Sequence, residues 1–428
     1  MLRHAILLTL ALMLALASAH NRIDMVRPDA PELADFGAYT PGVLTLTLIN
    51  PDQLDIVNAR PGAATPRYDR PLVVEVWYPA DAPAAAPGEH AYSVLTRDGA
   101  TTATLYGRAQ RDATPLLSEG PYPLVILSHG YPGNRFLMSH FGENLASKGF
   151  VVASIDHTDS TYGDQAAFGS TLLNRALDQR FVIDAMARLS ADEASGMAGL
   201  VDAERSAIIG YSMGGFGALN AVGAGFTEAS VGFGFAPPNR ELRARQAGTP
   251  EYLASLDERV RAVIAIGPWG MPAGFWDAEG LAGITTPVLF MAGSVDDVSG
   301  YEHGVAAIYR GAVNAERALL TFVNANHNAA APIAAPREVG PETFGHYADA
   351  VWDTTRMNNV AQHFATAFLG IHLQGDETLA PYLDLVADAA DGVVARDDAG
   401  SPTADHTYWR GFPDRTAVGL TFEQARPE

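Results

Sequence analysis

The sequence predicts an α/β fold built on a mostly parallel, doubly wound sheet with surface insertions. Two observations predict it: strand-like and helix-like segments alternate from about residue 124, and no internal repeat or Pro- or Ser-rich linker interrupts them. Strands that alternate with helices pair in parallel through right-handed crossovers. The 428 residues are 48% hydrophobic and 18% charged, which is enough apolar material for a large core. We therefore expect residues 20–428 to form a single domain.

Eight segments rich in β-branched or aromatic residues are the expected strands. Two of them precede the regular alternation, and the other six belong to it. In chain order they span 43–49, 72–78, 124–127, 149–155, 207–209, 262–266, 287–291 and 318–323.

Helices are expected at 136–148 and 171–189, near 304–309, and at 357–369. In the helix at 171–189 an apolar residue recurs at every fourth position, which predicts one buried face. The residues of this face are Leu173, Leu177, Phe181, Ala185 and Leu189, with Arg175 and Asp178 lying elsewhere.

Four further segments fit neither pattern. Residues near 80–120, 225–258 and 328–355 are expected as insertions, and 376–428 as a C-terminal extension. The first is rich in Ala, Pro, Thr and Gly, which indicates a surface excursion over the edge of the sheet, without visible chemistry.

The N-terminus has the pattern of a secretory signal peptide over residues 1–19. Arg3 precedes an apolar run of about 13 residues, and Ala17-Ser18-Ala19 offers a small-x-small cleavage site. A membrane-spanning helix needs about 20 apolar residues, so an uncleaved anchor is the poorer alternative, and no later segment approaches that length. We expect an exported protein, periplasmic or extracellular, with no integral membrane segment.

Charge and cysteine content exclude several classes of function. Lys and Arg number 28 against 49 Asp and Glu, and the net charge of −21 repels polyphosphates, so no nucleic acid partner is expected. The chain has 0 cysteines, which excludes disulfides, a thiol nucleophile and thiolate metal sites.

The pentapeptide Gly210-Tyr211-Ser212-Met213-Gly214 is the strongest chemical motif. It follows the expected strand at 207–209 and opens a run of small residues typical of a helix, which is the setting of a nucleophile elbow. A serine at so tight a turn is strained, and flanking glycines let strand and helix approach. The alternative is an ordinary glycine-rich turn with a capping Ser212.

A serine nucleophile needs a base, and the base needs an orienting carboxylate. His327 follows the strand at 318–323, in the chain order serine, acid, histidine, and is the expected base. Asp296, at the carboxyl end of the strand at 287–291, is the expected acid, with Asp297 as its competitor. Either aspartate could instead cap a helix. The other histidines compared are His129, expected to brace a loop, and His157, His303 and His346, expected in loops or at the surface.

A tetrahedral oxyanion needs two backbone donors. One is the N–H after the nucleophile, on Met213, and the second is expected on the loop after the strand at 124–127. Tyr131 in that loop offers an N–H, whereas Pro132 cannot. The alternative is that His129 and Gly130 form only a turn.

These motifs resemble the α/β-hydrolases, and more narrowly bacterial proteins similar to platelet-activating factor acetylhydrolase and the dienelactone hydrolase group. The features that carry the resemblance include Val74-Glu-Val-Trp-Tyr-Pro79, Leu127-Ser-His-Gly130, Gly210-Tyr-Ser-Met-Gly-Gly215 and Trp409-Arg-Gly-Phe-Pro413. The resemblance implies an eight-stranded α/β-hydrolase fold and ester hydrolysis.

Gly267-Pro-Trp269 is also similar to a segment of bacterial cutinases and polyester hydrolases, where the tryptophan lines the substrate cleft. By that resemblance Trp269 binds substrate; otherwise it is a core aromatic. Two departures matter: dienelactone hydrolases use a cysteine, which this chain lacks, and acetylhydrolases carry their acid where this chain has Gly267.

The sequence therefore predicts a secreted serine ester hydrolase that acts on short-acyl esters without metal or organic cofactor. Its substrate would be a small-molecule or polymeric ester. The alternative within catalysis is polyester or long-chain lipid hydrolysis, suggested by Trp269 together with Phe275, Trp276 and Trp352, which are expected in segments that line the cleft. The alternative outside catalysis is a pseudo-hydrolase that binds ligands without hydrolysing them. A metal-dependent hydrolase using His157, Asp159 and Asp164 is weaker, because their spacing fits no common ligand set.

Overall fold

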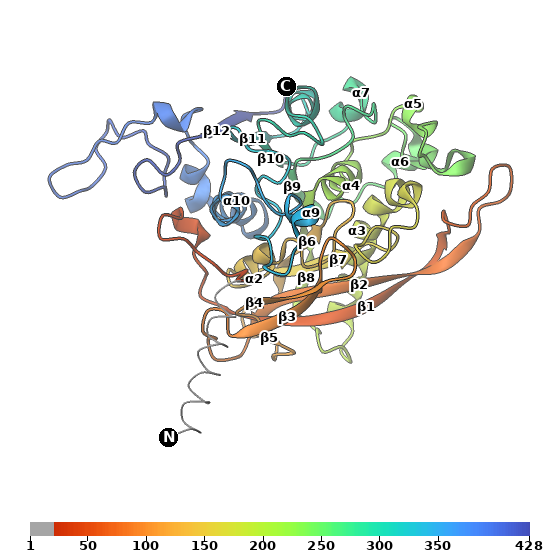
Figure 1. Cartoon of the computed structure of the whole chain (residues 1–428), viewed down its shortest axis with the longest axis horizontal. Coiled ribbons are helices and arrows are strands. Elements are labelled where there is room, and N and C mark those ends of the chain that lie inside the picture. Colours follow the sequence, from red (N-terminus) through yellow and green to blue (C-terminus); the bar gives the residue numbers. More distant parts are fainter. Residues whose placement is uncertain (1–20) are drawn as a thin grey trace, which may run out of the picture.

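The computed structural model describes residues 21–428, and one large sheet dominates it (Figure 1). Within these residues ten strands pair in the order β12-β11-β10-β9-β8-β6-β7-β2-β1-β5. The block from β6 to β11 is parallel, whereas β2 pairs antiparallel with both β1 and β7, and β12 antiparallel with β11. The strands of this sheet are β1 (Thr40–Leu54), β2 (Arg67–Ala80), β5 (Gln110–Arg111), β6 (Tyr122–Ser128), β7 (Val151–Asp156), β8 (Val201–Tyr211), β9 (Val260–Ile266), β10 (Val288–Gly293), β11 (Arg317–Phe322) and β12 (Leu420–Ala425).

Helices cover both faces of the sheet, because its central strands are apolar on both sides. In β6, Val125 and Leu127 join the core beneath α2 and α10, while Leu124 and Ile126 join the core beneath α3, α4 and α8. These helices are α2 (Ser139–Ala146), α3 (Phe168–Ala191), α4 (Met213–Ala221), α8 (Ala306–Gly311) and α10 (Thr354–Leu369).

The predicted fold class is confirmed: all eight expected strands are present in a mostly parallel, doubly wound sheet. The sheet gains two edge strands that the sequence did not indicate. Strand β5 has two residues, and β12 lies in the tail, where its short LTFEQA pattern is half exposed. Edge strands carry weak patterns because only part of their surface is buried.

The buried face of α3 differs from the prediction. Leu177, Phe181 and Leu189 are only half-buried, whereas Arg175 and Asp178 are 1% exposed. A step of exactly four residues drifts around a helix of 3.6 residues per turn, so the predicted stripe leaves the core. Arg175 and Asp178 are instead enclosed in a polar network described below.

The segments expected as insertions carry small elements of their own. Residues 80–120 contain a separate antiparallel hairpin, β3 (His90–Leu95) and β4 (Thr102–Gly107). The others contain short helices: α5 (Glu228–Val231), η2 (Pro238–Arg245), α6 (Pro250–Leu253), α9 (Pro341–Phe344), η5 (Glu377–Tyr382) and η6 (Ala389–Asp391).

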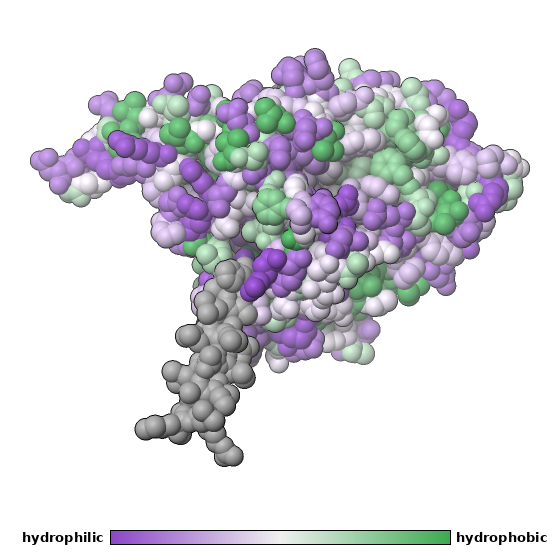
Figure 2. Space-filling view, in the orientation of Figure 1, coloured by the Kyte–Doolittle hydropathy of each residue, from purple (hydrophilic) through white to green (hydrophobic). Residues whose placement is uncertain are grey.

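Remaining short helices are η1 (Glu32–Ala34), α7 (Ala278–Ala282), η3 (Tyr301–Val305) and η4 (Gly370–Gln374). The expected signal peptide at 1–19 lies outside the described residues. Among residues 21–428, no helix combines the length and apolar character needed to cross a membrane. On the face shown in Figure 2, hydrophilic side chains are interspersed with scattered apolar ones.

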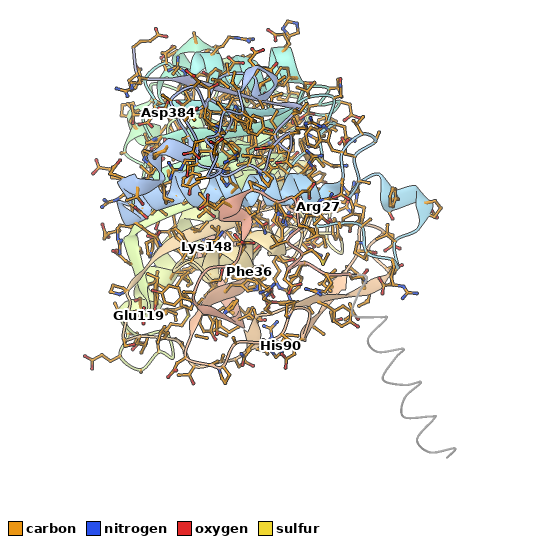
Figure 3. The ribbon with its side chains drawn as sticks, turned by 90° about the vertical axis from the view of Figure 1, so that its left-hand side faces the viewer. Arg27, Phe36, His90, Glu119, Lys148 and Asp384 are labelled. Atoms are coloured by element: carbon orange, nitrogen blue, oxygen red, sulfur yellow. The ribbon has the colours of Figure 1, made fainter. Side chains whose placement is uncertain are left out.

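Lys148, the single lysine of the chain, joins three distant segments. Its Nζ donates to the Leu33 carbonyl at 2.6 Å, to Asn144 Oδ1 at 2.7 Å and to Thr366 Oγ1 at 2.8 Å. Leu33 belongs to η1, Asn144 to α2 and Thr366 to α10, and Figure 3 shows Lys148 beside these elements. An ammonium group has three donors, so these acceptors satisfy it completely.

We expect Lys148→Met to destabilise the fold, because it leaves three enclosed acceptors without their donor. The expected loss is about 2 kcal/mol, which lowers Tm by about 2–3 °C in a chain of this size. Arg240→Met is the matched control: it removes an exposed cation paired with Glu228 and should leave Tm within about 1 °C. Equal Tm values for both variants would contradict the assigned role of Lys148.

Candidate active site

Ser212 stands on a strained turn between β8 and α4. Its φ of 53° and ψ of −113° lie where non-glycine residues are rare. Its N–H donates to the Ile266 carbonyl at 2.9 Å. A Cβ at Gly210 would lie 2.3 Å from the Gly214 carbonyl oxygen, and one at Gly214 would lie 1.8 Å from the Ser128 carbonyl oxygen. Both glycines are therefore required for the turn that holds Ser212.

His327 and Asp296 come from the loops after β11 and β10 and are joined by a hydrogen bond. His327 Nδ1–H donates to Asp296 Oδ2 at 2.9 Å. Asp296 Oδ1 accepts the N–H groups of Val298 at 2.9 Å and Ser299 at 2.7 Å. Burial opposes ionisation of Asp296, but the bonds from His327 and the two backbone N–H groups outweigh it and lower its pKa.

Ser212 and His327 line the same cavity, of about 300 Å³. Within residues 21–428, His327 Nε2 has no hydrogen-bond partner, and Nδ1 is occupied by Asp296. The free nitrogen of His327 is thus the one available to a serine hydroxyl or to a substrate in this cavity.

The two candidate acids differ in position. Asp296 is 7% exposed and bonded to His327, whereas Asp297 is exposed, lines the cavity, and makes no hydrogen bond within the described residues. The surroundings of Gly267 show why an acidic side chain does not fit at this position. Its φ is +50°, and a Cβ there would lie 3.2 Å from the His327 ring and 3.3 Å from Asp296 Oδ2. A side chain at 267 would press on the pair that β10 and β11 already supply.

Of the two expected oxyanion donors, Met213 follows Ser212 directly and Tyr131 lines the same cavity as Ser212. Met213 is the first residue of α4, where N–H groups lack intrahelical acceptors. Gly130 and Tyr131, on the loop after β6, line the cavity, and a Cβ at Gly130 would lie 3.3 Å from Ser212 Cβ. The loop therefore approaches the serine closely.

A buried polar network lies beneath this loop. Ser128 Oγ–H donates to His157 Nε2 at 2.8 Å, and His157 Nδ1–H donates to Asp178 Oδ2 at 3.0 Å. Arg70 Nε donates to the other oxygen of Asp178 at 2.8 Å. Arg175 donates to the His129 carbonyl. These bonds run from α3 and β2 to the start of the loop that carries Tyr131.

His157 lies in a loop, which is one of the two places expected for it, but it is buried rather than at the surface. His157 follows β7 but is 1% exposed. Burial, with the charge of Arg175 nearby, lowers its pKa to about 3, so the ring is neutral. The sequence could not reveal its partners, because Ser128 and Asp178 are distant in the chain. His129 does bond its own loop, through Nδ1–H to the Gly130 carbonyl at 2.7 Å.

Trp269 is half-buried beside the site but is not among the residues that line the cavity. Its N–H donates to the Ser212 carbonyl at 3.2 Å. Its ring packs against Phe168 at 5.6 Å and Phe275 at 5.5 Å between centroids. The expectation of Phe275 and Trp276 in a cleft is wrong, since they are 0% and 3% exposed and form part of the core.

Sequence reasoning did not assign Arg97 or Asn328 to the site, and it set His346 aside as a loop or surface histidine, yet all of these line the cavity. Arg97 belongs to the segment expected to carry no chemistry. Asp98-Gly99 beside it is a hairpin signal that could have located the turn. No sequence pattern indicates that this turn reaches Ser212.

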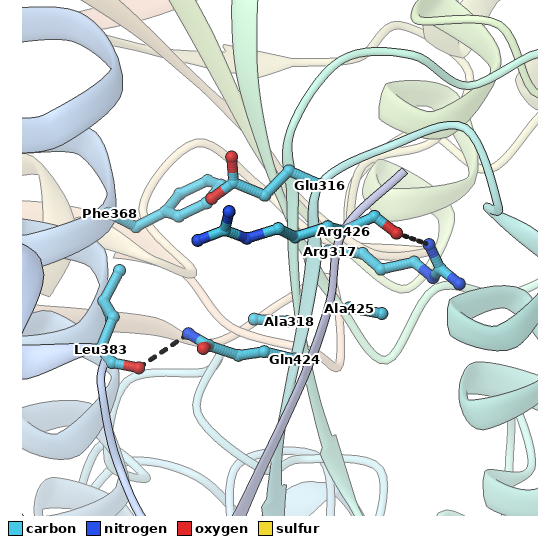
Figure 4. A pocket seen from close by; sticks show the side chains of 8 residues that line it. All are labelled: Glu316, Arg317, Ala318, Phe368, Leu383, Gln424, Ala425 and Arg426. Atoms are coloured by element: carbon cyan, nitrogen blue, oxygen red, sulfur yellow. Dashed lines mark hydrogen bonds between the residues drawn. The ribbon is translucent and has the colours of Figure 1, made fainter. Parts of the chain in front are cut away.

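A second hollow, of about 320 Å³, lies at the β11–β12 edge of the sheet (Figure 4). There Gln424 donates to the Leu383 carbonyl at 2.7 Å, and Arg317 donates to the Arg426 carbonyl at 3.2 Å. None of its eight wall residues is a serine or histidine. Within residues 21–428, no three His, Cys, Asp or Glu side chains gather as a metal site.

Known proteins resemble this chain in parts of its sequence. A family model described as PET hydrolase-like matches residues 113–250. Cutinase est1 of Thermobifida alba is 26% identical over 271 residues, which is 63% of this chain and 72% of that protein. The platelet-activating factor acetylhydrolase of Cavia porcellus is 42% identical over 60 residues, covering 13% of this chain and 14% of that protein.

Likeness in structure covers more of the chain. A ferulic acid esterase from Streptomyces cinnamoneus has a TM-score of 0.54 at 21% identity, over 90% of this chain and 96% of that chain. This likeness agrees with the α/β-hydrolase fold that the sequence motifs predict. The chain has the α/β-hydrolase fold and resembles cutinases in part of its sequence.

Proposed function

We propose that this chain is an exported serine ester hydrolase that acts on short-acyl esters through an acyl-enzyme. The observation that supports the proposal is that Ser212 and His327 line one cavity, with Asp296 bonded to the far nitrogen of His327. The cutinases and the esterase among the similar proteins support an ester as substrate.

In the proposed mechanism, Ser212 Oγ attacks the ester carbonyl while His327 Nε2 takes the hydroxyl proton. The N–H groups of Met213 and Tyr131 bind the oxyanion of the tetrahedral intermediate. Collapse of this intermediate expels the alcohol, which receives the proton from His327. Water then attacks the acyl-enzyme by the same proton route, releasing the acid and restoring Ser212. Asp296 holds the imidazole tautomer throughout.

We further propose that residues 20–428 act as one catalytic domain. Strands β1 and β12, from opposite ends of the described chain, belong to the same sheet as β8 and β10. This shared sheet supports the proposal of one domain. The segments near 80–120, 225–258 and 328–355 and the extension 376–428 then act as additions to that domain.

Short acyl groups are the expected preference, because the cavity is at the lower end of ligand-site volumes and Tyr131 forms part of its wall. We expect kcat/KM for 4-nitrophenyl esters to be highest between acetyl and about butyryl and to fall toward palmitoyl. The measurement is a steady-state series with increasing acyl length at constant ionic strength.

Polyester hydrolysis is the second candidate, favoured by the PET hydrolase-like match and the cutinase relatives. Faster turnover of palmitoyl than butyryl esters, or soluble products released from a solid polyester film, would transfer the assignment to it. Failure to hydrolyse any ester, together with no covalent labelling by a fluorophosphonate, would instead favour a ligand-binding pseudo-hydrolase.

A further inference from the structure

Arg97 brings a positive charge to the cavity that holds Ser212 and His327. It lies in the turn between β3 and β4, far from the serine in sequence. Its N–H donates to Tyr347 Oη at 3.0 Å, and Asn134 Nδ2 donates to the Leu95 carbonyl at 2.8 Å. The hairpin is therefore fastened to the loop after β6 and to the 328–355 segment.

The turn itself packs closely against Tyr162. Gly99 has a φ of +69°, and a Cβ there would lie 2.6 Å from the Tyr162 carbonyl oxygen. Only glycine fits both the backbone conformation and this contact. The turn that presents Arg97 is thus held in a defined place.

Among residues 21–428 the Arg97 guanidinium makes no ion pair and no side-chain hydrogen bond. The adjacent carboxylate of Asp98 is occupied within its own turn, by Ala100 N–H at 2.9 Å, Thr101 N–H at 2.8 Å and Thr101 Oγ1–H at 2.6 Å. An arginine that faces a cavity without a partner is available to a ligand.

Among the described residues that line the cavity, Arg97 is the only lysine or arginine. His346 lines the same cavity, but burial, with the charge of Arg97, lowers its pKa to about 3, so it is neutral. Its Nε2 is hydrogen-bonded to Tyr162 Oη at 2.7 Å. Asp297, exposed in the same wall, carries the opposite charge and lies more than 4 Å from the guanidinium.

We propose that Arg97 binds a carboxylate of the substrate, so that the enzyme selects esters carrying one free carboxylate, on either the acid or the alcohol portion. A guanidinium donates two parallel hydrogen bonds to a carboxylate. A chain of net charge −21 repels anions in general. A single arginine near Asp297 therefore suits a monoanion better than a phosphate dianion. This inference rests on the proposed ester hydrolysis.

Two matched substrate pairs test the inference. In the first pair, mono-4-nitrophenyl glutarate carries its carboxylate on the acid portion of the ester, and its methyl ester is the neutral partner. In the second pair, 4-acetoxybenzoate carries its carboxylate on the alcohol portion, and its methyl ester is again the neutral partner. For each substrate, kcat/KM of the variant is divided by kcat/KM of the wild type. This ratio cancels differences in leaving-group reactivity between the substrates.

We expect Arg97→Gln to lower kcat/KM for at least one carboxylate-bearing substrate about 10- to 100-fold, mainly through KM, and to change its neutral partner less than about twofold. Arg97→Lys should recover part of the loss, because it keeps the charge without the planar fork. Asp297→Asn should shift KM for the same substrate in the opposite direction. Added salt should weaken the preference of the wild type.

A loss confined to one pair assigns the carboxylate to that portion of the ester and supports the inference. Equal losses for charged and neutral partners in both pairs, or no effect on either charged substrate, would overturn it. The neutral esters also separate the two proposals: if the wild type hydrolyses them but Arg97→Gln does not lower kcat/KM for either charged substrate, the ester hydrolase stands and the carboxylate site falls. If the wild type hydrolyses none of the four esters, ester hydrolysis itself fails.

Discussion

Ser212→Ala is expected to abolish covalent labelling by a fluorophosphonate and to lower kcat by at least about 10³. The strained turn after β8 holds Ser212 in the cavity wall, and Oγ is the atom proposed to form the acyl-enzyme. Alanine removes the nucleophile but leaves the oxyanion donors and the cavity, so a small residual rate should remain. Labelling followed by intact-mass measurement, with kcat on 4-nitrophenyl butyrate, gives both readouts.

Ser93→Ala is the matched control, because Ser93 is exposed on β3. It should keep full labelling and full activity. His327→Ala should lose activity comparably to Ser212→Ala, since the hydroxyl then lacks its base. Retained labelling in Ser212→Ala would refute the assignment of the nucleophile. A larger loss in His303→Ala or His157→Ala, in a variant that still folds, would refute the assignment of the base.

Asp296→Asn is expected to keep the fold and to lower kcat by about 10²–10⁴. The carboxylate accepts His327 Nδ1–H on one oxygen and two backbone N–H groups on the other. An amide has only one acceptor oxygen, so it cannot satisfy all three donors and no longer favours the tautomer that leaves Nε2 free. The measurement is kcat on a neutral short-acyl ester, with a circular dichroism spectrum to check the fold.

The neighbouring substitution Asp297→Asn provides the comparison. Asp297 makes no hydrogen bond to His327 within the described residues, so its loss should lower kcat on the neutral ester less than about tenfold. The reverse ranking, or full activity in both variants, would exclude Asp296 as the acid and direct attention to Asp277 or Asp156.

The sequence alone located the eight expected strands and the serine turn, since these depend on local properties. β-Branched runs such as Val151–Asp156 predict buried strands, and Gly210 is required by a steric contact with Gly214, within a few residues of Ser212. The chain order of strand ends also placed His327 and Asp296 near Ser212, because parallel strands end on the same edge of the sheet. Asp296 stays the proposed acid rather than Asp297, because the loop that carries it starts at Gly293 and His327 donates a hydrogen bond to it.

Tertiary structure alone decided which distant groups meet at that edge. In the folded chain the turn of the β3–β4 hairpin lies at the cavity, so that Arg97 forms part of its wall. The fold also buries His157 between its hydrogen-bond partners Ser128 and Asp178. These contacts join residues separated by 21 to more than 100 positions, and their partners are chosen by the packing of whole elements. Local periodicity carries no information about such packing, which is why it predicted the strands but not the walls of the site.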